Sequence, residues 1–244
     1  MVVNLRYIKT IAMPVKIALL GDYDPSMVTL KAINDTFDPL MNQLNKDIRF
    51  LWFDTDKFNY EKAFRDGYAG LWITPGSPYR DMENVLNSIS YTRQNNIPTF
   101  GNCGGFQHMA IEFARNVCHI YNADHQETNP SGKELIIVKL ACSLVEQSEL
   151  LTITQKDSIL NRIIGKDQFT GKYFCSYGIN SQYLKNLESN GLLFTAMSED
   201  GQMRAFEIQS HPFFLGTLFQ PAMTSDENHL NPLIVEFVKR CIQN

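Results

Sequence analysis

The sequence predicts a three-layer α/β fold, in which a mostly parallel central sheet carries helices on both faces. Short apolar segments alternate with segments of helical periodicity, which is typical of parallel sheets. A glycine-rich turn at residues 101–105 joins one of these apolar segments directly to a helix. With 244 residues, the chain is long enough for one large domain. We therefore expect a single domain over residues 1–244, with residues 1–13 as an N-terminal extension.

The first half of the chain alternates strands with helices. Strands are expected at residues 15–21, 48–53, 70–74 and 97–100. Helices are expected at residues 27–44, capped by Asp24 or Ser26, and at residues 81–95. Ligands of such sheets bind at the carboxyl ends of the strands, where Gly21, the segment 75–77 and Cys103 all fall.

The second half is less regular. Strands are expected at residues 134–140 and 192–196, with a helix at residues 158–164 between them. Two neighbouring strands at residues 204–209 and 213–219 are joined by Ser210-His211-Pro212. An amphipathic helix at residues 231–242, with Pro232 in its first turn, closes the chain.

Composition excludes several classes of protein. The net charge is −4 and no basic run occurs, so nucleic acid is not an expected partner. No segment approaches about 20 uninterrupted apolar residues, so no membrane span is expected. The five cysteines show no paired spacing and no signal peptide precedes them, which indicates reduced thiols and a cytoplasmic location. We expect neither a metal nor a cofactor.

Cys103 is the strongest candidate for chemistry. It lies on the predicted strand-to-helix turn Gly101-Asn102-Cys103-Gly104-Gly105, the arrangement of a nucleophile elbow with Cys in place of Ser. Glycine suits such a turn because a Cβ there would crowd the strand or block a substrate. The positive end of a helix also favours a thiolate placed beside it. The pattern therefore predicts a cysteine nucleophile.

Several further stretches resemble one family. Besides residues 101–107, they are residues 16–21, the Pro75-Gly76 loop, and residues 111–117, 177–180 and 211–214. Over roughly residues 14–242 the chain resembles the glutamine amidotransferase domain of CTP synthases, a class I amidotransferase with a Cys-His-Glu triad. The resemblance implies a flavodoxin-like sheet and Cys103 as the nucleophile that attacks an amide.

The resemblance also assigns roles to other positions. The backbone N–H groups of Gly76 and Gly104 match an oxyanion hole. Gln107 and Glu127 match residues that hold the amino-acid end of the substrate. At the position of an arginine that grips the substrate carboxylate, this chain has Ser176, followed by Tyr177.

The chain departs from the family where the triad should be completed. The family's last strand ends with His and Glu, and Gln220 and Ala222 stand at these positions here. Glutamine has no useful basicity at neutral pH and alanine cannot orient a base, so ordinary glutaminase activity is doubtful. His125 and His229 are the candidate substitute bases. His211 lies at the start of the strand that Gln220 ends, too far from Cys103 to act as its base. His108 and His119 belong to the helix after Cys103 or to its exit, where a structural role is expected.

Three functions remain open. The first is a cysteine hydrolase or amidotransferase that acts on a small amide or ester other than glutamine. The second is an inactive binding or regulatory module, and the third is a glutaminase subunit that a partner completes. We expect no synthetase domain in this chain, so released ammonia would need a separate synthetase or acceptor subunit. A homodimer is a further expectation.

Overall fold

The computed structural model describes residues 13–244, so residues 1–12 of the expected extension lie outside the described residues. Within this range the central sheet has nine strands, in the order β2 (Ile48–Phe53), β1 (Val15–Leu20), β3 (Tyr68–Ile73), β4 (Thr99–Asn102), β12 (Phe214–Thr217), β11 (Met203–Glu207), β10 (Leu193–Ser198), β7 (Ser148–Ile153) and β8 (Gln168–Lys172). The five strands from β2 to β12 are parallel. The four from β11 to β8 extend the sheet in antiparallel fashion.

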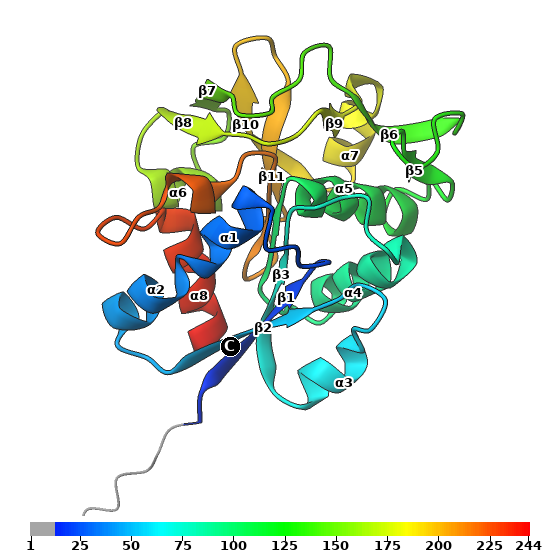
Figure 1. Ribbon diagram of the computed structural model, residues 1–244. Coiled ribbons are helices and arrows are strands. Elements are labelled where there is room, and N and C mark those ends of the chain that lie inside the picture. Colours follow the sequence, from blue (N-terminus) through cyan, green and yellow to red (C-terminus); the bar gives the residue numbers. More distant parts are fainter. Residues whose placement is uncertain (1–12) are drawn as a thin grey trace, which may run out of the picture.

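Helices cover both faces of the parallel strands, which confirms the predicted three layers (Figure 1). On one side lie α1 (Val28–Asn34), α2 (Phe37–Leu44) and α8 (Pro232–Gln243), with α6 (Ile159–Ile164) packed on α8. On the other side lie α3 (Tyr60–Arg65), α4 (Met82–Gln94) and α5 (Gly104–Asn116). The apolar strands of the parallel half are therefore buried from both faces.

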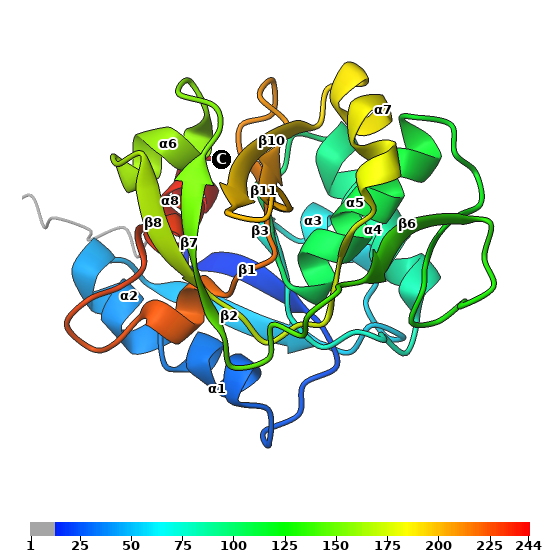
Figure 2. The same ribbon diagram turned by 90° about the horizontal axis from the view of Figure 1, so that it is seen from above.

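A second, smaller sheet lies beside α5. It consists of β5 (Ala123–His125), β6 (Glu134–Lys139) and β9 (Tyr177–Ile179). Figure 2 shows β6 next to α5 and away from β7 and β8. Two short helical segments follow β9, first η1 (Ser181–Tyr183) and then α7 (Leu184–Ser189). A third, η2 (Pro221–Thr224), follows β12.

The helix expected over residues 27–44 is two helices instead. Pro39 explains the break, because in one continuous helix it would remove a backbone hydrogen bond and clash with the preceding turn. Starting α2 at Phe37 places Pro39 in the first turn, where its missing N–H costs nothing. The predicted cap is also wrong: Met27 occupies the N-cap of α1, and Asp24 instead accepts hydrogen bonds from the N–H and hydroxyl of Ser26.

The other predicted helix starts are confirmed by their caps. Side-chain oxygens of Asp81, Ser158 and Asn231 accept backbone N–H groups at the starts of α4, α6 and α8. Pro232 lies in the first turn of α8, as predicted. Elements with weaker patterns, namely α3, α7, β5, β7, β8 and β9, were not predicted.

Aromatic side chains join the sheet to α8. The rings of Trp72 on β3, Phe100 on β4 and Phe237 on α8 lie with their centroids 5.4–5.9 Å apart. Phe213, just before β12, packs on the last two. All four side chains are buried. This cluster holds β3, β4 and β12 together beneath the edge at which Cys103 lies.

Replacement of Gly105 by alanine tests how tightly the elbow helix packs on the sheet. A Cβ at this position would lie 2.3 Å from the carbonyl oxygen of Ile73, which is backbone and cannot rotate away. We expect Gly105→Ala to lower the free energy of unfolding by about 1–3 kcal/mol, measured by urea denaturation. Gly178→Ala is the matched control, because its Cβ would meet only the ends of leucine side chains. Equal losses in both variants would contradict the close packing.

Candidate functional site

Cys103 occupies a strained position between β4 and α5. Its backbone has φ 50° and ψ −107°, which non-glycine residues rarely adopt. The N–H of Cys103 donates to the carbonyl of Thr217 at 3.0 Å, and its carbonyl accepts the N–H of Gln107 at 3.1 Å. These two hydrogen bonds hold the backbone on both sides of the side chain. The sharp strand-to-helix turn predicted at Cys103 is therefore present.

A chain of side-chain hydrogen bonds beneath the elbow connects three strands. The indole N–H of Trp72 on β3 donates to the side-chain oxygen of Asn102 at 2.6 Å. The amide of Asn102 donates to the hydroxyl of Thr217 on β12 at 2.7 Å. All three residues are buried, so these polar groups satisfy one another away from water. They hold the strand ends on either side of Cys103 in register.

The loop after β3 approaches the start of α5 closely. A Cβ on Gly104 would lie 3.1 Å from the backbone nitrogen of Ser77, and Gly76 has φ 120°, a conformation that favours glycine. The N–H of Gly104 belongs to the first turn of α5, where backbone donors have no partner within the helix. Neither this N–H nor that of Gly76 donates to another group of residues 13–244. Two backbone donors are thus free beside the elbow.

A pocket of about 210 Å³ opens at the sulfur of Cys103. It contains most of the residues that the sequence assigned to the site, namely Gly76, Cys103, Gln107, Glu127, Ser176, Tyr177 and Gln220. Its other lining residues are Met27, Thr29, Pro75, Ser77, Phe174 and Cys175. No motif predicts three of these residues, Met27, Thr29 and Phe174. They come from the start of α1 and from the segment before β9.

Gln107 is the centre of a polar network in this pocket. Its amide N–H donates to the carbonyl of Tyr177 at 3.0 Å, and its oxygen accepts a hydrogen bond from Nε2 of His125 at 3.1 Å. The hydroxyl of Ser77 donates to Oε2 of Glu127 at 3.1 Å. The network ties α5, β5 and β9 to the loop after β3. It therefore orients Glu127 toward the pocket rather than leaving it free.

His125 has no free ring nitrogen with which to act as a base. Its Nδ1 accepts the backbone N–H of Glu127 at 3.0 Å, so Nε2 carries the proton that it donates to Gln107. Burial, together with the neighbouring His108, lowers the pKa of His125 to about 3. Burial lowers the pKa of His108 to about 4. Both imidazoles are therefore neutral at pH 7, and His125 serves the network instead.

His229 lies outside the pocket as well. It is exposed in the loop after η2, where its N–H donates to Asp226 at 2.8 Å, and it lines a separate hollow beside α1 and α2. His211 is buried at the opposite end of β12, near the carbonyl of Thr92. Ala222 is buried in η2 and does not line the pocket. The structure therefore brings neither expected substitute base to Cys103.

Gln220 and Thr29 carry buried polar atoms without a hydrogen-bond partner in residues 13–244. The atoms are Nε2 of Gln220 and Oγ1 of Thr29. Both residues line the pocket, and both are at least 97% buried. The backbone N–H of Gln220 donates to Lys172 at 2.8 Å, which holds the residue in place. Unpaired buried donors are rare, and they mark this wall of the pocket as a place for a hydrogen-bond acceptor.

Glu127 gives the pocket its charge. It is the one acidic side chain among the lining residues described, and no Lys, Arg or His lines the pocket within residues 13–244. At the position where the resemblance implies an arginine, the hydroxyl of Ser176 lies 3.0 Å from that of Ser143. The pocket therefore suits a cationic group better than a carboxylate, because a buried anion without a partner is costly.

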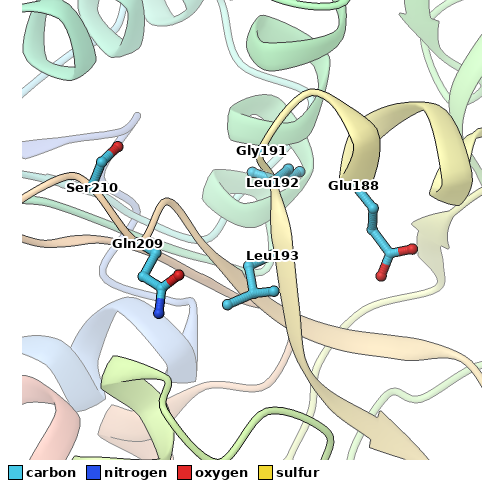
Figure 3. A pocket seen from close by; sticks show the side chains of 6 residues that line it. All are labelled: Glu188, Gly191, Leu192, Leu193, Gln209 and Ser210. Carbon is cyan, nitrogen blue, oxygen red and sulfur yellow. The ribbon is translucent and has the colours of Figure 1, made fainter.

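A second hollow, of about 550 Å³, lies far from this chemistry. It is lined by Glu188, Gly191, Leu192, Leu193, Gln209 and Ser210 (Figure 3). In Figure 3 the chain at residues 191–193 separates Glu188 from Gln209, and their polar groups do not point toward one another. Residues 209–210 precede β12, whereas Cys103 lies beyond its carboxyl end. We assign no chemistry to this hollow.

Residues 13–244 contain no group of three or more His, Cys, Asp or Glu side chains placed to hold a metal ion. No helix within the same residues is both long and apolar enough to cross a membrane.

Comparison with known proteins identifies relatives. A family model described as Glutamine amidotransferase class-I matches residues 36–240. The CTP synthase of Mycoplasmopsis pulmonis is 31% identical over 242 residues, which cover 94% of this chain and 45% of that protein. The CTP synthase of Chlorobium phaeobacteroides is 31% identical over 238 residues, which cover 92% and 42%. The chain spans less than half the length of these relatives.

Solved structures show the same fold. The glutaminase domain of Trypanosoma brucei CTPS, with bound acivicin, superposes with a TM-score of 0.86 at 22% identity, covering 94% of each chain. A glutamine amidotransferase of Thermotoga maritima superposes with a TM-score of 0.59 at 9% identity, covering 95% of this chain and 100% of that one. Both similarities span the central sheet and its helices.

The buried state of His125 predicts how stability depends on pH. The unfolded chain binds a proton at this imidazole below about pH 6.5, and the folded chain binds none until about pH 3. The free energy of unfolding should therefore fall as the pH drops, by up to about 1.4 kcal/mol per pH unit from this group. In His125→Gln this contribution disappears. The free energy of unfolding, measured by urea denaturation, should therefore fall less steeply between pH 7 and 4 in this variant than in the unchanged protein. If the free energies of unfolding of the two proteins, each taken relative to its value at pH 8, change equally with pH, the neutral state of buried His125 is contradicted.

Proposed function

The chain belongs to the class-I glutamine amidotransferase family, and from that premise we propose that it is a thiol hydrolase in which Cys103 attacks a small amide or ester bearing an ammonium group. One observation carries the proposal. Cys103 stands on a strained turn, and it lines a pocket together with Gly76, whose backbone N–H is free within residues 13–244, and with Glu127, which supplies a carboxylate. Such an arrangement matches acyl transfer through a thioester.

In the proposed reaction, the Cys103 thiolate adds to the substrate carbonyl carbon. The carbonyl oxygen becomes an oxyanion, which accepts hydrogen bonds from the N–H groups of Gly76 and Gly104. Collapse of this intermediate breaks the C–N or C–O bond, the amine or alcohol leaves with a proton taken from water, and an acyl thioester remains on Cys103. Water then hydrolyses the thioester and restores the thiol. Both donors belong to backbone that the packing of α5 against the loop after β3 holds rigidly.

The charge of the pocket limits the class of substrate that would bind. The Glu127 carboxylate, oriented by Ser77, would bind an ammonium group, as its match in the family suggests. A substrate carboxylate would meet Ser176 and no cation, so its burial would be unfavourable. The preferred substrate class is therefore an amine with a neutral remainder, such as glutamine without its carboxylate. Gln220 and Thr29 would supply further polar contacts in the pocket.

The absence of a general base beside Cys103 limits which substrates would react. No histidine of residues 13–244 lines the pocket, and Gln220 and Ala222 stand where we place the family's triad partners. Without a general base the rate falls by about 10²–10⁴, so we propose that glutamine is a poor substrate and that carbonyls with good leaving groups are better ones.

A second candidate is a binding or regulatory module that uses the pocket without chemistry. The observation that favours it is the same absence of a histidine beside Cys103 in the described chain. For a pure binder, Cys103→Ala would leave ligand binding and cellular function unchanged. Because the strained backbone of Cys103 costs free energy that binding alone does not need, we favour the hydrolase.

Partners follow from the relatives. CTP synthases are more than twice as long as the matched region. If this chain releases ammonia, we propose that a synthetase or another acceptor subunit consumes it. A homodimer is the alternative assembly, and size-exclusion chromatography with light scattering distinguishes the two.

The substrate class is tested with the 4-nitroanilide of 4-aminobutyrate, which presents an ammonium group and no carboxylate. We expect the release of nitroaniline to require Cys103, with at least a hundredfold loss in Cys103→Ala. Glu127→Gln should lower kcat/KM at least tenfold, because it removes a charge-assisted hydrogen bond. The 4-acetamidobutyrate analogue, which lacks the charge, is the matched control and should react equally with both forms of residue 127. Equal losses on both substrates would contradict the role of Glu127.

A further inference from the structure

Cys175 shares the pocket with Cys103, and the proposed hydrolysis does not use it. Both thiols line the pocket, and both side chains are buried. The three other cysteines, Cys118, Cys142 and Cys241, do not line it. Two cysteines of the described chain thus meet at one cavity, although they lie 72 positions apart in the sequence (175 − 103 = 72).

The backbone brings the two cysteines to the same two-residue segment at the end of β12. The N–H of Cys103 donates to the carbonyl of Thr217 at 3.0 Å, and the thiol of Cys175 donates to the next carbonyl, that of Leu218, at 3.3 Å. The thiol of Cys103 in turn lies 3.9 Å from the carbonyl of Phe174, the residue before Cys175. The sulfur of Cys103 therefore lies against the backbone that precedes Cys175, and both cysteines are bonded to consecutive carbonyls at the end of β12.

The two sulfurs also act on each other. Interaction with the Cys103 sulfur, together with burial, raises the pKa of the Cys175 thiol well above its usual value. At neutral pH the pair therefore holds a proton on Cys175, while Cys103 lies at the N-terminus of α5, where a negative charge is favoured. This asymmetry assigns attack on an external electrophile to Cys103.

We propose that Cys103 and Cys175 form a reversible intramolecular disulfide when a peroxide oxidises Cys103. In the first step the Cys103 thiolate attacks one oxygen of a hydroperoxide, the O–O bond breaks, and the leaving alkoxide or hydroxide takes a proton. Cys103 becomes a sulfenic acid.

In the second step the sulfur of Cys175 attacks the sulfur of Cys103. The S–O bond breaks, the hydroxyl group leaves with the Cys175 proton as water, and the S–S bond forms. The peroxide gains two electrons and the two thiols lose two. An external dithiol reverses the reaction by thiol–disulfide exchange and is itself oxidised. The disulfide blocks the nucleophile, so the pair makes the pocket sensitive to redox state, independently of which acyl substrate it takes.

The test oxidises the fully reduced, full-length protein with a small molar excess of hydrogen peroxide. We expect intact-protein mass spectrometry to show a mass decrease of two hydrogen atoms, and peptide mapping after alkylation under denaturing conditions to find a Cys103–Cys175 cross-link. Dithiothreitol should restore both the mass and the alkylation of both thiols. Persistence of two free thiols, or a cross-link from Cys103 to the exposed Cys142, would overturn the proposal.

Two variants separate the redox pair from a general oxidation. In Cys175→Ser the cross-link should vanish and the sulfenic acid on Cys103 should persist long enough for dimedone to trap it. In Cys241→Ser, a matched change of another buried cysteine, the cross-link should remain. Thermal unfolding by circular dichroism verifies that both variants fold. Loss of the cross-link in Cys241→Ser as well, with the fold intact, would contradict the pairing. Nitroanilide hydrolysis is measured on the same samples, so a cross-link without hydrolysis removes only the proposed function.

Discussion

The backbone of Cys103 is the constraint on which the site depends. A residue with φ 50° and ψ −107° persists only when the surroundings enforce it, and here β4, β12 and α5 do so through hydrogen bonds on both sides of the residue. The relay from Trp72 through Asn102 to Thr217 holds the strand ends, and Gly105 lets α5 start directly against Ile73. The chain thus spends folding free energy to present a sulfur at the edge where parallel sheets bind ligands.

The pocket lined by Cys103 combines positions that match the family resemblance with positions that depart from it. The free N–H groups of Gly76 and Gly104 and the network around Gln107 fit the role that the family resemblance implies. Glu127 remains the charged group of the described lining, whereas Ser176 and Gln220 are neutral. Under the proposed function, the Glu127 carboxylate, the polar side chains of the lining and the Cys103 thiol would together select the substrate. Cys175 adds a second sulfur to the same cavity, which couples the site to redox chemistry.

The parallel half of the fold was predictable because its signals are local. Apolar strands such as residues 48–53 and caps such as Asp81 and Asn231 report their structure through neighbouring residues. The elbow was predictable for the same reason, since three glycines flank one cysteine. The division of residues 27–44 into two helices was missed because the periodicity continues through Pro39, and only the position of the proline within a first turn decides the break.

The parts of the fold and of the site that were not predictable depend on contacts between segments far apart in the sequence. Strands β7 and β8 alternate polar and apolar residues weakly, and pairing with β10 and with each other defines them. His125 illustrates the limit for the site: its position in the sequence next to Glu127 suggested a base, but its environment makes it a buried hydrogen-bonding link. The proximity of Cys103 to Cys175 likewise arises from β12, to which both segments are bonded.

The most direct measurement is the rate at which iodoacetamide alkylates each cysteine of the fully reduced protein between pH 5 and 9, followed by peptide mass spectrometry. Burial raises the pKa of Cys118 to about 11, so its thiolate is scarce at neutral pH although the residue is more exposed than Cys103. The account predicts that Cys103 reacts at least about tenfold faster than Cys118 and Cys241 at pH 7, because it presents a nucleophilic sulfur to a pocket. Alkylation of Cys103 no faster than that of these two would contradict the assignment of Cys103 as a nucleophile.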